Sequence, residues 1–333
     1  MKRKIFLAVT MAMTTVFLAS CSACEACSGN TKVSFKDYYL SDANHAVSEV
    51  NETLSYDVVH EGNNSYNGYK INYANGTYTT TLTKNKDNKD TPFNESETYT
   101  LVSKFSIDVT YEFNGTSVEF TDTTNASVIF YAAKNSLQPL SSQKTVYSHS
   151  PSQNTPSKIE DCYTEYHQTI TTEYNDACTG GKTTVVNHKF PNSQPDVQNF
   201  EIEDADKYTY LDNEQLLFAL RCMTPTTSGK VQIYSPFVKS VQTIKTVFGS
   251  ANTSQFHLKL NGATEKQTYE ISYLPVNVDL EAKHNGATQE VWIAETLNIT
   301  NNEYRNVMLQ YTTPLPFNLG KLQYKLVSAN FTK

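Results

Sequence analysis

The stretch FSIDVTYEF, residues 105–113, is followed directly by Asn114-Gly115 and decides the fold class of this chain. Its apolar and polar residues alternate, as they do in a strand, where successive side chains point to opposite faces. Asn-Gly after such a run predicts a tight hairpin, because both central residues of a type I′ turn have positive φ. The stretch therefore predicts an antiparallel strand pair with one apolar face and one polar face.

The same signal recurs elsewhere in the sequence. Asn75-Gly76, Asn261-Gly262 and Asn285-Gly286 each stand between runs in which apolar and polar residues alternate. Each pair predicts a further hairpin. We therefore expect a mainly β fold, a curved antiparallel meander that is half-barrel-like or a sandwich, with two short helices.

The first helix is predicted over residues 41–54, because apolar residues recur there at spacings of three and four. These residues are Ala43, Ala46, Val47, Val50 and Leu54. The second helix is predicted to begin at Asp212, a good N-cap with Gln215 three places on, and to end near Met223. Both helices are short, so strands are expected to dominate the fold.

The domain organisation follows from changes in composition. Residues 38–333 are predicted to form a β-rich domain, with a candidate subdivision at 148–158, where Pro151 and Pro156 interrupt polar sequence. A strand pair is expected after it, over 159–174 and 182–190. The loop from Asn175 to Gly181 would join these two strands.

The N-terminus has the form of an export signal. Lys2, Arg3 and Lys4 precede an apolar run, residues 5–17, and small residues follow. The run is shorter than the roughly 20 apolar residues that a membrane-spanning helix needs. We therefore expect residues 1–20 to be a signal peptide and residues 21–37 to be a flexible tether.

Leu18-Ala19-Ser20-Cys21 resembles the lipobox of bacterial lipoproteins. The resemblance implies cleavage before Cys21, acylation of that residue with chains such as palmitate, and attachment to the extracytoplasmic face of the cell membrane. Several acyl chains suffice for stable anchoring. The alternatives are an ordinary cleaved signal with Cys21 as a free thiol, and a register shifted to Cys24. The shifted register would put Cys21 where a Leu is wanted.

Composition limits the other partners. The formal charge of −7 argues against nucleic acid, whose binding relies on clustered Lys and Arg. Cys24 and Cys27 are too few for a closed zinc site, and Cys162, Cys178 and Cys222 show no disulfide framework. We expect no cofactor, no metal ion and no catalytic residue. Cys21 is the one site residue predicted.

Four other patterns resemble parts of binding sites, but each is predicted to have a structural role. Gly180-Gly181-Lys182-Thr183 ends like a phosphate-binding loop, but Asp176 stands where the first Gly should be, which favours a hairpin turn. His167 and His188 are predicted to be a cross-strand surface pair. An acidic group is predicted to be a solvated loop rather than a calcium site; it consists of Glu201, Glu203, Asp204 and Asp206. Seven tyrosines at strand spacing are predicted to pack across strands rather than to line a ligand site; they are Tyr66, Tyr69, Tyr73, Tyr78, Tyr99, Tyr111 and Tyr131.

The order of these elements resembles that of periplasmic lipoprotein-carrier and lipid-transport lipoproteins. That order is a lipobox, a tether, a helix running into the strand from Leu54 to Val58, a long meander, a central helix and a second meander. The resemblance covers about residues 38–333 and implies a curved half-barrel whose apolar hollow holds acyl chains. This chain is longer, and its expected helices are fewer and shorter than in those families.

The leading functional hypothesis is a membrane-anchored extracytoplasmic binding lipoprotein that carries a lipid or other amphiphile in a concave sheet. One alternative is a surface-displayed β-domain module for interaction or adhesion, binding protein or glycan. A lesser alternative is an anchored hydrolase, although no GxSxG elbow or Ser-His-Asp order stands out. A hollow lined by aliphatic and aromatic residues would favour the carrier. A solid core would favour the module.

Overall fold

The computed structural model describes residues 33, 35, 51–85, 98–133, 136–202, 208–225, 229–236, 239–280, 288–295 and 306–332. Within these residues the fold is mainly β and barrel-like, built on one sheet of 17 strands, which confirms the predicted fold class. No helix in these ranges is long and apolar enough to cross a bilayer. The signal, Cys21, the tether except Val33 and Phe35, and residues 203–206 of the acidic group lie outside the described residues.

The long strands come first along the chain and the shorter ones later. The strands are β1 (Asn51–Glu61), β2 (Ser65–Tyr66), β3 (Tyr69–Lys84), β4 (Thr98–Phe113), β5 (Thr116–Ala133), β6 (Ser136–Pro151), β7 (Tyr163–Tyr174), β8 (Gly180–Asn187), β9 (Asp196–Glu201), β10 (Thr209–Leu211), β11 (Gly229–Ser235), β12 (Ser240–Phe248), β13 (Asn252–Leu260), β14 (Gln267–Leu280), β15 (Gln289–Ala294), β16 (Met308–Pro314) and β17 (Lys321–Thr332). The helix α1 spans Leu216–Cys222, and 3-10 turns cover Ile159–Asp161, Asn213–Gln215 and Pro316–Asn318.

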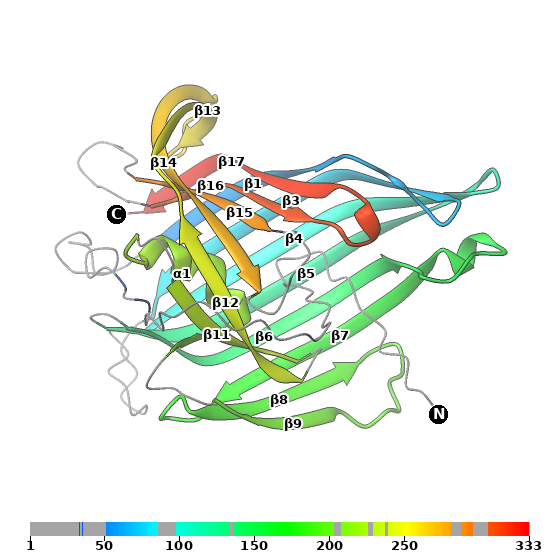
Figure 1. Cartoon of the computed structure of the whole chain (residues 1–333), viewed down its shortest axis with the longest axis horizontal. Helices are drawn as coiled ribbons and strands as arrows, with labels where there is room; N and C mark the ends of the chain where they lie inside the picture. The colour runs from blue at the N-terminus through cyan, green and yellow to red at the C-terminus, as the bar shows by residue number, and fades with distance from the viewer. Residues whose placement is uncertain are drawn as a thin grey trace, which may run out of the picture.

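The sheet is an antiparallel meander that is extended through its first strand. Strands β3 to β9 pair in sequence order, and β1 pairs with β3 on one side and with β17 on the other. From β17 the sheet continues through β16, β15, β14, β12 and β11 to β10, with parallel pairing only in β10–β11 and β13–β17 among the described strands. Figure 1 shows β11, β12 and β14 crossing in front of the long strands.

The hairpin predicted at residues 105–115 is confirmed. Phe105, Ile107, Val109 and Tyr111 are buried, and β4 pairs with β5 across the turn. Asn114-Gly115 has the two positive φ values, 50° and 79°, that a type I′ turn requires. The Asn261-Gly262 pair likewise begins the connection between the paired strands β13 and β14. Asn285-Gly286 lies outside the described residues, but the strands on either side of it, β14 and β15, are paired.

The hairpin predicted at Asn75-Gly76 is wrong. The pair lies inside β3, where the register with β4 shifts between Ala74 and Thr77, so it forms a β-bulge. Asn75 takes the positive φ of 51°, and its side-chain amide donates to Asp108. A Cβ at Gly76 would collide with the carbonyl oxygen of Val58 on β1. The glycine therefore serves close strand approach, and the strand continues through it.

The two predicted helices have different outcomes. The first is wrong over residues 51–54, because they begin β1, where they pair with both β3 and β17. Its residues 41–50 lie outside the described residues. The second is confirmed as α1, preceded by the 3-10 turn that Asp212 caps by accepting from the backbone N–H of Glu214.

The segment 148–158 contains both strand and irregular backbone. β6 extends through Pro151, and β7 pairs with β6 from Tyr163↔Pro151 onward, so the ladder resumes directly after the segment. The predicted pair 159–174 and 182–190 is present as β7 and β8, with a short 3-10 turn in place of strand at residues 159–161. The sheet is therefore continuous from β6 into β7.

The core is rich in tyrosine, and three of the buried hydroxyl groups donate to backbone carbonyls. Tyr56 donates to the carbonyl of Met308 (3.0 Å), Tyr69 to that of Ser152 (2.9 Å) and Tyr111 to that of His149 (2.6 Å). A buried phenol is favourable only when its O–H finds such a partner. Tyr69, Tyr78, Tyr99 and Tyr111 are buried, which confirms the packing role predicted for them.

The helix α1 is held against the concave face of the sheet by a buried ion pair. Arg221 of α1 makes two bonds to Glu52 of β1, Nη1–Oε1 at 2.6 Å and Nη2–Oε2 at 2.7 Å, and both side chains are at most 4% exposed. Its Nε donates to the carbonyl of Asn306, whose side-chain amide donates back to the carbonyl of Arg221. On the same helix, Phe218 packs on Phe130 of β5.

The two ends of the sheet meet through side chains rather than through a backbone ladder. Phe200 of β9 stacks on Tyr234 of β11 with ring centroids 4.1 Å apart, and Tyr174 of β7 contacts Tyr210 of β10. With Ile202, these residues form a second buried cluster, separate from the main core. We call it the seam, and it closes the barrel-like shape between β9 and β10.

Glu52→Gln is expected to lower the free energy of unfolding by about 3–5 kcal/mol, because it leaves the guanidinium of Arg221 buried without a counter-charge. Urea unfolding followed by circular dichroism measures the change. Glu173→Gln is the control, since Glu173 pairs with Lys182 at an exposed site, and its loss should cost less than about 1 kcal/mol. Equal losses in the two variants would contradict the role assigned to the buried pair.

Candidate functional site

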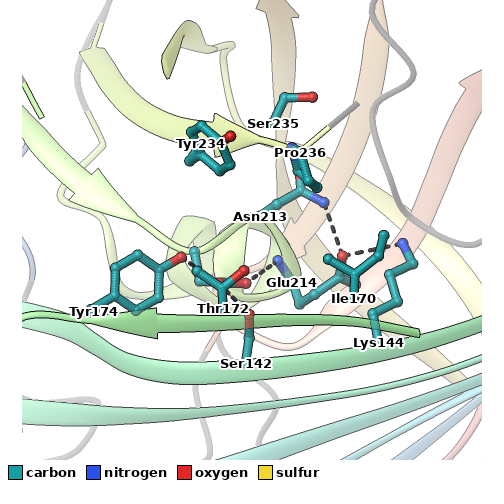
Figure 2. A pocket seen from close by; sticks show the side chains of 11 residues that line it. Ser142, Lys144, Ile170, Thr172, Tyr174, Asn213, Glu214, Tyr234, Ser235 and Pro236 are labelled. Carbon is teal, nitrogen blue, oxygen red and sulfur yellow. Dashed lines mark hydrogen bonds and ion pairs between the residues drawn. The ribbon is translucent and has the colours of Figure 1, made fainter. Parts of the chain in front are cut away.

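A polar pocket lies where the 3-10 turn Asn213–Gln215 meets β6 and β7 (Figure 2). Its empty space is about 30 Å³, enough for one or two water molecules. Hydroxyl, carboxylate and ammonium groups from four segments converge on it. They are Ser142, Lys144, Thr172, Tyr174, Asp212, Asn213, Glu214, Tyr234 and Ser235, with the apolar Ile170 and Pro236.

Asp212 is the hub of this pocket. Its Oδ1 accepts from the backbone N–H of Glu214 (2.8 Å), and its Oδ2 accepts from the hydroxyls of Ser142 (2.6 Å) and Tyr174 (2.5 Å). The carboxylate therefore caps the 3-10 turn and fastens it to two strands at once. Burial raises the pKa of Tyr174 well above 10, and the negative charge of Asp212 adds to the effect.

Lys144 and Glu214 form a second link between the sheet and the turn. Lys144 Nζ lies 3.1 Å from Glu214 Oε1, and the side chains are only 4% and 8% exposed. Burial lowers the pKa of Lys144 and raises the pKa of Glu214, while the charge of each partner opposes the shift of the other. Asn213 also donates to the same carboxylate oxygen (3.0 Å).

Perturbed pKa values in a pocket are a mark of functional sites, but ion-pair networks produce them as well. Here the geometry favours the network. Asp212 already accepts three hydrogen bonds, and Glu214 already accepts from Lys144 and Asn213. Both carboxylates therefore serve to hold the turn against the sheet. With room for little more than water, the pocket works as a clamp that fixes α1 against β6.

A second buried polar pair joins β5 to the end of β6. His149 Nδ1 lies 2.8 Å from Asp122 Oδ1, and the backbone N–H of His149 donates to both oxygens of Asp122. The imidazole stacks on Phe120 with ring centroids 3.6 Å apart. Burial raises the pKa of Asp122, and the bonds from His149 oppose that rise. Among the described residues no hydroxyl bonds to this imidazole, so the pair packs the sheet.

Some of the residues singled out in the sequence lie side by side, since Gly180 of the glycine pair is opposite Glu201 of the acidic group, but they form no metal or phosphate site among the described residues. Gly180-Gly181-Lys182-Thr183 begins β8, and Glu201 ends β9. His167 and His188 are a cross-strand pair with ring centroids 4.8 Å apart, as predicted. Within the described ranges no three His, Cys, Asp or Glu residues are arranged to hold a metal ion. The three Cys residues in these ranges, Cys162, Cys178 and Cys222, form no disulfide bond.

The buried charges were not found from the sequence, although a signal for two of them exists. Asp122 shares the strand phase of Phe120, and Lys144 shares that of Val146, so alternation puts both on the apolar face. A charged residue in an inward position predicts a buried partner. The partners Glu214 and His149 are supplied by other elements, which alternation does not reveal.

Comparison with known proteins gives little beyond the fold. No family model matches the chain, and no curated protein sequence matches it significantly. A solved structure with some similarity is a beta-barrel-like protein of domain of unknown function DUF1849 from Brucella abortus. It aligns over 85% of this chain and 98% of its own, with 11% identity and a TM-score of 0.43.

Asp212→Asn is expected to lower the free energy of unfolding by about 1–3 kcal/mol. Both carboxylate oxygens face donors, whereas an amide offers one acceptor and turns its N–H₂ toward a donor. The matched control is Asp176→Asn in the exposed loop after β7, which should change the free energy by less than about 0.5 kcal/mol. Equal urea midpoints for Asp212→Asn and the wild type would contradict the clamp.

Proposed function

We propose that this chain is a membrane-tethered, extracytoplasmic binding protein that engages its partner on the outside of the barrel-like sheet. The observation that carries the proposal is the filling of the concave face by the protein's own side chains. The proposal retains the tethered binding protein expected from the sequence. It selects the surface-displayed module over the carrier of a lipid or other amphiphile.

The concave face offers little room for an acyl chain. Tyr56, Tyr111, Tyr324 and Phe130 are each at most 2% exposed there, and Phe218 of α1 packs on top of Phe130. Interiors packed in this way leave few voids larger than a water molecule. The polar pocket between α1 and the sheet holds only about 30 Å³. A bound lipid would have to displace α1 and its buried ion pairs.

The outer face is polar, and its side chains lie in cross-strand rows. Lys104, Asn125, Thr145 and Thr169 lie opposite one another on β4 to β7, and Lys104 and Asn125 are exposed. Thr169 contacts the hydroxyl of Thr145 (3.1 Å) and the imidazole of His188 (2.8 Å). Such rows are typical of a sheet face that meets water. They favour a polar partner such as a protein or a glycan.

The tether is the part of the proposal that rests on sequence. We propose that acyl chains on Cys21 make the contact with the membrane. The net negative charge of the chain disfavours binding to anionic lipid and to nucleic acid. The buried carboxylates of Asp212, Glu214 and Asp122 bond to neighbouring strands and turns, and this structural use supports a binding role over that of an anchored hydrolase.

Acylation is tested by growing cells that express the protein with an alkyne-bearing fatty acid. The wild type should carry the label and Cys21→Ser should carry none. Cys24→Ser is the matched control and should keep the label, because the lipobox register puts acylation on Cys21. Label retained by Cys21→Ser, or lost from Cys24→Ser, would contradict the proposed anchor.

Lipid carriage is tested by solvent extraction of the purified full-length protein and mass spectrometry of the non-covalent extract. We expect no lipid at a stoichiometric level, because the core is filled by side chains. A lipid recovered at about one molecule per chain would overturn surface binding and establish the carrier. Acyl chains on Cys21 do not confuse the result, since they remain with the protein.

A further inference from the structure

The strand β9 is an open edge of the sheet. It pairs with β8 along its whole length, and no other described strand pairs with it. Figure 1 shows β9 as the outermost ribbon of the long meander. An edge strand presents N–H and C=O groups that a further strand can bond.

The hydrogen-bond pattern shows which residues present these groups. The N–H of Ile202 donates to the carbonyl of Thr179 just beyond the ladder. In an antiparallel pair every second residue bonds to the neighbour. Counting back by twos from Ile202, Phe200 and Gln198 bond to β8. The backbone groups of Val197, Asn199 and Glu201 therefore point away from the sheet.

β9 is also held rigid from its inner side. Gln198 accepts from the hydroxyl of Tyr234 (3.0 Å), Phe200 stacks on Tyr234, and Asp196 pairs with Lys239 (2.8 Å). These contacts with β11 and with Lys239, which directly precedes β12, fix the strand before any partner arrives. A template that is already ordered loses little conformational entropy when a strand is added.

Three features that often block pairing at an edge, Lys, Pro and a bulge, are absent from the described residues of β9. Natural edges carry Lys, Pro or a bulge that blocks pairing, or they are covered by another element. β9 reads DVQNFE, with neither Lys nor Pro, and its register with β8 has no shift. Val197 in its outer row is 55% exposed. An exposed β-branched residue on such an edge favours pairing with another strand.

An open hollow beside the end of β9 indicates what kind of strand would fit. It is a shallow depression open to solvent, lined by Asn199–Ile202 of β9 and its continuation, by Gly180–Lys182 of β8, and by Glu173 and Tyr174 of β7. Glu173 in this lining pairs with Lys182 (3.0 Å). Glu201 has no basic partner among the described residues, so a carboxylate stands ready for a cationic side chain.

We propose that β9 is a docking edge to which an extended, Lys- or Arg-bearing segment of a partner protein adds as a further strand. A basic side chain of that segment enters the hollow beside Glu201. The inference rests on the proposed function and names the class of partner. A second copy of this chain fits less well, because joining two chains of formal charge −7 would gather Asp196 and Glu201 from both copies at one junction.

The test uses the full-length protein and a short synthetic peptide in which Lys alternates with Val and Thr, with binding measured by fluorescence anisotropy. The peptide should bind, and its counterpart with Glu in place of Lys should not. Val197→Pro removes an N–H that faces away from β8, which the ladder tolerates. It should weaken binding about tenfold. Glu201→Gln should weaken binding about threefold, and Glu160→Gln, at an exposed pair elsewhere, should not change it.

A second measurement uses only the wild-type protein, so it does not depend on whether Val197→Pro folds. Two versions of the Lys peptide are made, one N-methylated at its odd-numbered amides and the other at its even-numbered amides, so that each lacks the N–H donors of one edge. Only the version that lacks the donors facing β9 should bind the wild type at least about tenfold more weakly. Equal binding of both methylated peptides, or no binding of the Lys peptide, would overturn the docking edge. So would a dimer seen by sedimentation that Val197→Pro abolishes. None of these results affects the acylation and lipid tests, so the two proposals fail separately.

Discussion

The bond between Arg221 and Glu52 is the contact on which the rest of the structure depends. It joins α1, β1 and the segment before β16, which lie far apart in sequence. Two buried charges are tolerated only when each is fully bonded, so this contact allows one position of the helix. That position puts Phe218 against Phe130 and fills the concave face. The close packing of these described side chains, on which the proposal of binding at the outer face rests, is supported by this ion pair.

The clamp at Asp212 and the seam complete the enclosure that α1 begins. Asp212 fastens the 3-10 turn to β6 and β7, and the seam brings β9 against β11 by ring stacking. Closure by side chains differs from closure by a hydrogen-bonded ladder, because it leaves backbone N–H and C=O groups at the edge strands without a ladder partner. A barrel closed by hydrogen bonds has no edges, whereas in this sheet no other described strand pairs with the second side of β9. The seam therefore covers the core and leaves one side of β9 without a described strand partner.

Local patterns predicted the strands well and their partners poorly. The alternation of Phe105 to Tyr111 and the turn at Asn114-Gly115 depend on neighbours in sequence, and both are confirmed. Asn75-Gly76 carries the same signal as Asn114-Gly115, but β1 packs against it and makes it a bulge. Residues 51–54 fit a helical spacing, yet pairing on both sides draws them into β1. The buried pairs Lys144–Glu214 and Asp122–His149 needed contacts that no local period encodes.

The pairing of β1 with β17 has a consequence for how the chain reaches its native state. β1 lies near the start of the described residues and β17 at their end, and the two pair over eleven register positions. Because β1 also borders β3, the middle of the sheet is incomplete until the last strand has arrived. Contacts between residues so distant in sequence slow folding. During synthesis, the apolar faces of β1 and β3 would therefore stay exposed to water until the C-terminus emerges, and the incomplete chain is prone to aggregation over that interval.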